Sequence, residues 1–118
     1  MHSHILLKAS LDISNPLLTN IIFGKSFLIE WIRFNTMKMI SEPIMHKFET
    51  EKNSKTNPGG ISGIALLCES HVSIHTYPET NTIYADIFSC KELDKEKNTE
   101  FIKRYGTKDL DIELVFRY

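Results

Sequence analysis

Alternation of apolar and polar positions is the strongest pattern along this chain. From residue 72 to 77 every second side chain is apolar or small, and the same period returns from 82 to 90. A period of two is that of a strand with one face in the core. Residues 61–68 form a nearly continuous apolar run, which predicts a buried strand. Three further segments with strand-like patterns are residues 5–7, 40–48 and 111–118.

Helical periodicity is confined to two segments. Apolar residues recur at helical spacing from 17 to 32, after Asn15 and a proline, a pair typical of a helix start. Gly24 and its polar neighbours are expected to kink or fray this helix. A second, short helix is expected to be capped by Asn98 or the following threonine and to end at Gly106. The order of elements predicts an α+β fold, a two-layer sandwich of an antiparallel sheet with helices packed on one face.

Composition and charge narrow the class of protein. The 118 residues suffice for a single domain, 1–118. A formal net charge of −1 with scattered Lys and Arg predicts no nucleic-acid partner and no acidic membrane partner. No apolar run reaches the roughly 20 residues that span a bilayer, and the first residues lack the basic region of a signal peptide. Two cysteines are too few for a disulfide framework, so we expect reduced thiols and a cytoplasmic protein.

Reactive side chains are concentrated in residues 69–79, which hold two histidines, two serines, a tyrosine and two carboxylates. Zinc is one interpretation. However, His71 and His75 stand four apart on a strand, about 13 Å, and Zn–N bonds are about 2.0–2.1 Å, so they cannot share one ion. A hydrolase is a second interpretation, but Ser70 lies in no Gly-x-Ser-x-Gly motif. A third interpretation makes the Cys90 thiol a nucleophile, but only the identity of the residue supports it. We therefore expect no metal.

Four short motifs stand at fixed spacing between residues 45 and 90. They are Gly60-Ile61-Ser62-Gly63, Glu69-Ser70-His71, Ile74-His75-Thr76-Tyr77-Pro78-Glu79 and Ala85-Asp86-Ile87-Phe88-Ser89-Cys90. Together they resemble the small prokaryotic S-adenosylmethionine decarboxylase family, whose members are made as proenzymes that cleave themselves. Several motifs that match at once are more specific than one short motif.

The resemblance implies self-cleavage between Glu69 and Ser70, giving chains 1–69 and 70–118, with Ser70 converted to a covalent pyruvoyl group. An amine substrate would form a Schiff base with this group, which absorbs electrons as pyridoxal phosphate does elsewhere, so no pyridoxal phosphate is expected. The family pattern gives Ser62 a part in processing and makes His75 the base of that step. It makes Cys90 the proton donor during decarboxylation.

The substrate implied by the resemblance is S-adenosylmethionine, decarboxylated to supply the aminopropyl donor for spermidine in polyamine biosynthesis. Phe48 matches the residue that stacks on adenine, and Glu79 matches the one that binds the ribose hydroxyls. Lys8 stands where the family more often has an acidic residue, Tyr77 replaces the commoner tryptophan, and 49–60 is long and expected to be a solvated connector.

Two alternatives therefore remain open. One is the same pyruvoyl chemistry on ornithine or arginine. The other, of a different class, is an unprocessed homologue that binds and regulates a partner. We expect the working form to be a homodimer of processed protomers.

Overall fold

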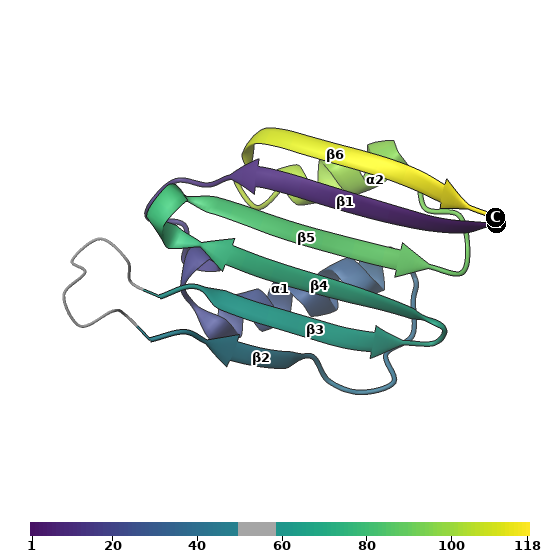
Figure 1. Cartoon of the computed structure of the whole chain (residues 1–118), viewed down its shortest axis with the longest axis horizontal. Helices are drawn as coiled ribbons and strands as arrows, with labels where there is room; N and C mark the ends of the chain where they lie inside the picture. The colour runs from purple at the N-terminus through teal and green to yellow at the C-terminus, as the bar shows by residue number, and fades with distance from the viewer. Residues whose placement is uncertain (50–58) are drawn as a thin grey trace.

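Six antiparallel strands form one sheet in the computed structural model, which describes residues 1–49 and 59–118 (Figure 1). The order across the sheet is β2-β3-β4-β5-β1-β6. The strands are β1 (His2–Ser10), β2 (Ile44–Lys47), β3 (Ile61–Leu67), β4 (Ser70–Tyr77), β5 (Thr82–Ser89) and β6 (Lys108–Arg117). Helices α1 (Ile21–Phe34) and α2 (Lys95–Lys103) pack on one face, which confirms the predicted α+β sandwich. The short 3-10 helices are η1 (Pro16–Leu18) and η2 (Pro78–Thr80).

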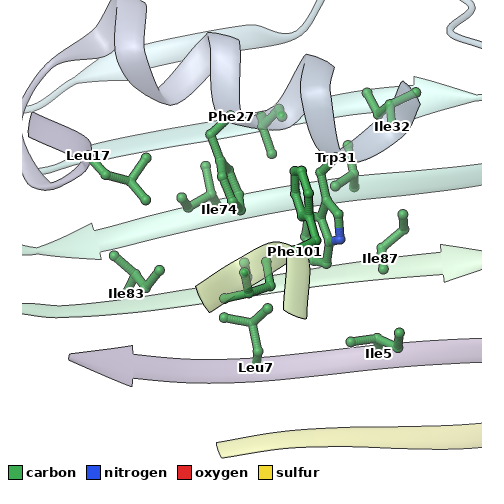
Figure 2. Packing of buried hydrophobic residues seen from close by; sticks show 14 of the residues in the cluster. Ile5, Leu7, Leu17, Phe27, Trp31, Ile32, Ile74, Ile83, Ile87 and Phe101 are labelled. Atoms are coloured by element: carbon green, nitrogen blue, oxygen red, sulfur yellow. The ribbon is translucent and has the colours of Figure 1, made fainter. Parts of the chain in front are cut away.

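The helices cover only one of the two faces of the sheet, here called the core face. Phe27 of α1 lies beside Ile74 of β4 on this face, as Figure 2 shows, and both are fully buried, as is Trp31. The other side is the open face, on which no helix packs among the residues that the structure describes. Strand pairing assigns to it His4, Leu6, Lys8, Ser62, Ile64, Leu66, His71, Ser73, His75, Tyr84, Asp86 and Phe88.

Strand β3 differs from its prediction as a buried strand. Its odd positions face the core, with Ile61 at 1% exposure, but Ile64 and Leu66 on the open face are 47% and 59% exposed. Both faces of β3 are therefore apolar, but only the core face is buried within this chain. β2, in contrast, lies at the edge of the sheet and begins directly after Pro43, where a proline is tolerated.

Two helix starts also differ from their predictions. Asn15 caps η1 through its side chain, whereas α1 begins at Ile21 behind a second cap, Asn20, whose Oδ1 accepts from two backbone N–H groups. Asp94 caps α2, because its Oδ1 accepts from the backbone N–H of Lys97 at 2.9 Å. Asparagine and aspartate are strong caps, so each prediction found a competent residue type but placed the helix wrongly by several residues.

Asn98, predicted as a cap, instead lies buried inside α2. Its Oδ1 accepts from Trp31 Nε1 at 2.8 Å and from Asn35 Nδ2 at 2.9 Å. These bonds satisfy the indole N–H, which would otherwise be buried without a partner. They also join the two helices.

Gly24 does not interrupt α1, which runs without a break from Ile21 to Phe34. A Cβ at this position would lie 2.2 Å from Cδ1 of Ile61. Glycine therefore allows the helix to approach β3 closely. Most of the long 49–60 segment lies outside the described residues, since these omit 50–58. In the part of the chain that the structure describes, no helix has the length and apolar character to cross a membrane.

Candidate functional site

Ser62 and His75 form a direct side-chain pair on the open face. They are cross-strand partners in the β3–β4 ladder, and Oγ of Ser62 lies 2.7 Å from Nδ1 of His75. At this distance a proton can pass between the hydroxyl and the imidazole. The sequence placed both residues in the same processing step, and the structure brings them together.

A pocket of about 480 Å³ opens beside this pair. Phe48, which follows β2, and Glu79 of η2 contribute to its walls, so the two residues matched to substrate binding lie in the same pocket as Ser62 and His75. The remaining lining residues are Glu49, Gly59, Gly60, Thr76 and Tyr77. This volume is within the range of small-molecule sites in proteins.

Thr76 is a structural determinant of this pocket that the sequence did not reveal. Its Oγ1 accepts from the backbone N–H of Ile61 at 2.8 Å and donates to the carbonyl of Leu18 at 2.6 Å. The hydroxyl is buried, and it ties the end of β4 both to β3 and to η1. A cross-strand and cross-layer bond of this kind depends on tertiary pairing, which no local pattern in the sequence encodes.

Gly60, another residue of the pocket wall, lies very close to the backbone of β4. A Cβ there would lie 2.2 Å from the carbonyl oxygen of Thr76. Only a residue without a side chain can pass the backbone of β4 at this point. Lys8, by contrast, is not among the residues that line the pocket, and its ammonium lies 5.8 Å from the ring centroid of Tyr84.

The Glu69–Ser70 bond lies at the hairpin between β3 and β4. Leu67 and Ser70 form the last pair of the ladder, so Cys68 and Glu69 make a two-residue turn. Glu69 has φ of +57°, in the left-handed region. A residue with a Cβ is disfavoured there by roughly 1–2 kcal/mol. The bond therefore follows a residue held in an unfavourable backbone conformation.

Ser70 and Cys90 meet at this same end of the sheet. The backbone N–H of Cys90 donates to Oγ of Ser70 at 3.2 Å. Ser70 is 8% exposed, whereas Cys90, directly after β5, is exposed with a free thiol. The hydrogen bond holds the hydroxyl beside the turn, and the exposed thiol is accessible to a small molecule.

The predicted site residues therefore fall into two groups that one chain does not bring together. His75 stands five residues beyond Ser70 on β4, a separation of about 16 Å at roughly 3.3 Å per residue. The two side chains also leave opposite faces of the strand, because positions 70 and 75 differ in parity. One group is Ser62, His75, Phe48 and Glu79; the other is Glu69, Ser70 and Cys90.

Among solved structures, the crystal structure of the adenosylmethionine decarboxylase from Aquifex aeolicus VF5 has the same fold. Its TM-score is 0.79 at 22% identity, and the match covers 99% of this chain and 90% of that one. At this identity the similarity establishes the architecture, a two-layer α+β sandwich.

Sequence comparison identifies the family. The family model described as S-adenosylmethionine decarboxylase matches residues 4–117, so the chain belongs to that family. It is 40% identical over 67 residues to the S-adenosylmethionine decarboxylase proenzyme of Methanococcus maripaludis strain S2, a match that covers 52% of this chain and 55% of that protein. It is 41% identical over 63 residues to the proenzyme of Archaeoglobus fulgidus, covering 50% and 56%. The chain thus matches only about half the length of these relatives.

The conformation of Glu69 leads to a stability prediction. We compare Glu69→Gly with Glu69→Ala, both in a chain carrying Ser70→Ala so that residue 70 lacks its hydroxyl. Both substitutions remove the carboxylate, but only glycine adopts a positive φ without a Cβ penalty. Urea unfolding should show the glycine variant to be about 1 kcal/mol more stable than the alanine variant. Equal stability would show that this turn is not strained.

Proposed function

We propose that the chain cleaves its own Glu69–Ser70 bond and then acts as a pyruvoyl-dependent S-adenosylmethionine decarboxylase. The observation that carries the proposal is the Ser62–His75 pair, 2.7 Å apart, in one pocket with Phe48 and Glu79. Membership in the family, and relatives whose name includes the word proenzyme, support it. The product would be the aminopropyl donor of polyamine synthesis, and the two free thiols suit the cytoplasm.

Self-cleavage begins with the hydroxyl of Ser70. Oγ attacks the carbonyl carbon of Glu69, the C–N bond breaks, and an ester replaces the amide while the nitrogen of residue 70 takes a proton. A base then removes the α-proton of residue 70, and the C–O bond breaks with Glu69 leaving as a carboxylate. The resulting dehydroalanine hydrolyses to a pyruvoyl group and ammonia. His75 is the proposed base, and the Ser62 hydroxyl relays the proton through its contact with Nδ1.

The pyruvoyl group supplies the carbonyl electrophile and the electron sink that decarboxylation requires. Cys90 holds the proton that the product carbon needs. Its backbone already contacts residue 70 in the intact chain, and its thiol is exposed. A thiol is one of the side chains that act as general acids in enzymes.

The pocket chemistry favours an adenosine-containing substrate. Phe48 is 50% exposed, so its ring offers a face for a planar base. Glu79 can accept two hydrogen bonds from a ribose diol. Ornithine and arginine have neither group, and they would use a carboxylate only to pair with the side-chain cation. S-adenosylmethionine is therefore the substrate that uses both residues.

We further propose that two protomers assemble each site. Ser70 and His75 lie about 16 Å apart on one strand, so if His75 is the base, the His75 that acts on residue 70 belongs to a second chain. A two-fold axis between two stacked sheets, perpendicular to β4, would place the first residue of one β4 beside the last residues of the other. A hollow of about 240 Å³, lined in part by Ser62, Ser73 and His75, leaves room at the pair.

The open face has the composition that such an assembly needs. Its exposed apolar and aromatic side chains, between 39% and 72% exposed, are Leu6, Ile44, Ile64, Leu66, Tyr84 and Val115. Exposed apolar side chains gathered on one face are the kind of surface that a protein partner covers, and here they lie on both sides of the polar row of β4. Stacking two open faces would give an isologous homodimer with four layers.

Cleavage is tested by intact mass measurement of the purified protein. The expected masses are those of residues 1–69 and of residues 70–118 carrying a pyruvoyl group, and the second fragment should resist Edman sequencing. Ser70→Ala should remain whole, because alanine has no hydroxyl to attack the Glu69 carbonyl. A wild-type chain that stays intact after long incubation would contradict the proposal and would favour the unprocessed regulatory homologue.

Shared sites are tested by mixing two uncleaved variants. Ser70→Ala lacks the nucleophile and His75→Ala lacks the base, so each alone should stay whole. When the two are coexpressed with distinguishable tags, the His75→Ala chain should be cleaved, because its Ser70 meets His75 of the other protomer. The Ser70→Ala chain should stay whole in the same mixture. Cleavage of neither chain, with mixed dimers present, would show that each protomer processes itself.

Substrate choice is tested by carbon dioxide release from carboxyl-labelled S-adenosylmethionine, ornithine and arginine at equal concentration. Release should come from S-adenosylmethionine alone. Glu79→Gln should then raise KM by roughly 10- to 100-fold, the value of a hydrogen bond to a charged group, while kcat changes little. Cys90→Ala should instead lower kcat by at least about 10²-fold. Carbon dioxide release from ornithine or arginine only would contradict the proposed substrate, but it would still agree with the proposed pyruvoyl chemistry.

A further inference from the structure

A second cluster of chemically active side chains lies on the open face, away from the pocket. It consists of His4 on β1, His71 on β4 and Asp86 on β5. Nε2 of His4 lies 2.7 Å from Oδ2 of Asp86, and Nε2 of His71 lies 3.3 Å from the same oxygen. Two imidazole nitrogens from different strands thus point at one carboxylate oxygen. Neither the processing step nor substrate binding, as proposed above, uses these residues.

The sheet fixes the positions of the three residues. His4 and His71 are both cross-strand partners of Phe88, one on each side of β5. Asp86 stands two residues earlier on β5 and therefore faces the same way. All three backbones belong to continuous antiparallel ladders, which hold them at fixed spacing. A site built on strands keeps its geometry better than one built on loops.

Asp86 is oriented and charged for binding a cation. The hydroxyl of Ser73 donates to Oδ1, which leaves Oδ2 directed at the two imidazoles. Burial raises the pKa of the Asp86 carboxyl, but the hydrogen bonds from Ser73 and His4 and the nearby imidazoles outweigh it, and the pKa is lowered overall. The carboxylate is therefore ionised near neutral pH.

Phe88 lines the cluster with an apolar wall. Its ring stacks on His71 at a centroid distance of 5.7 Å and meets His4 edge-on at 5.6 Å. The side chains of His4 and Asp86 are 21% and 23% exposed, and that of His71 is 40% exposed. The ligand atoms are thus partly screened from solvent, which strengthens electrostatic attraction for an ion.

We propose that His4, His71 and Asp86 form a binding site for a divalent transition-metal ion such as zinc. Two imidazoles and one carboxylate are a ligand set typical of these ions. The three ligand atoms lie within 4.8 Å of one another. Around a tetrahedral zinc ion, ligand atoms stand about 3.3 Å apart. The contact between His71 and Asp86 already has this length, and small side-chain rotations bring His4 to it.

Metal binding replaces hydrogen bonds that the apo site makes. Without an ion, each Nε2 carries the proton that it donates to Oδ2 of Asp86. With an ion, the lone pair of each Nε2 binds the metal, and the proton that this nitrogen carried moves to Nδ1 or to solvent. Three protein ligands leave the remaining coordination position of the ion to water or a further ligand. Ser73 then acts as the outer partner that orients the carboxylate.

This site differs from the zinc site that the sequence argued against. There the pair was His71 with His75, four residues apart on one strand and too distant to share an ion. Here His71 is paired with a histidine from a different strand. Because β1 is far from β4 in the sequence, the order of strands in the sheet was needed to bring them together.

The test is titration of the chelator-treated full-length chain with cobalt(II), followed by its visible absorption, and with zinc by calorimetry. Ser70→Ala serves as the parent, so that the chain lacks the residue 70 hydroxyl throughout. We expect one ion per chain. His4→Ala, His71→Ala and Asp86→Asn should each weaken binding at least 10-fold, and Ser73→Ala should weaken it less.

His46→Ala is the matched control, since it removes an exposed imidazole of the edge strand β2, which carries none of the cluster. It should bind as the parent does. Circular dichroism checks the fold of each variant, and if His71→Ala does not fold, His4→Gln decides instead. No saturable binding would overturn the proposal and leave a hydrogen-bonded network only. Equal binding by the parent, His4→Gln and His71→Ala would also overturn it, since the ion would then be held elsewhere.

Discussion

The structure depends on one constraint, which is that helices cover a single face of the sheet. Every second residue of β4 and β5 is buried on the core side, and the residues between them face outward. The core positions are apolar or hydrogen-bonded, as the Thr76 hydroxyl is. The outward positions are free to carry histidine, serine and aspartate. Apart from Ser70, whose side chain is buried on the core side, the reactive side chains of these strands therefore lie on the side that does not stabilise the core.

The sequence predicted the elements that local periodicity encodes. The faces of β4 and β5 were correct because alternation depends on neighbouring residues alone. The prediction that β3 is buried on both faces was wrong, since an apolar run has the same pattern whether its second face is covered or exposed. The caps were misplaced because Asn15, Asn20, Asp94 and Asn98 are all competent cap residues, and only packing decides which one begins a helix.

The candidate site was predicted in part, and through its motifs. The Ser62–His75 pair and the pocket with Phe48 and Glu79 appeared where the motifs implied. The distance between Ser70 and His75 follows from their five-residue separation along β4. It can be calculated from the sequence once residues 70–77 are taken as one continuous strand. The contacts of His4 with Asp86 could not be predicted, because they depend on β1 pairing with β5 across more than 80 residues.

The order of strands in the sheet has a consequence for the chain after the proposed cut. Residues 1–69 supply β2, β3 and β1, and residues 70–118 supply β4, β5 and β6. Along the sheet the two pieces therefore alternate, with β1 of the first piece inserted between β5 and β6 of the second. Three of the five strand junctions would join different polypeptides, and the Trp31–Asn98 bond would do so as well. A severed molecule of this kind is interwoven, and its halves could separate only if the sheet itself came apart.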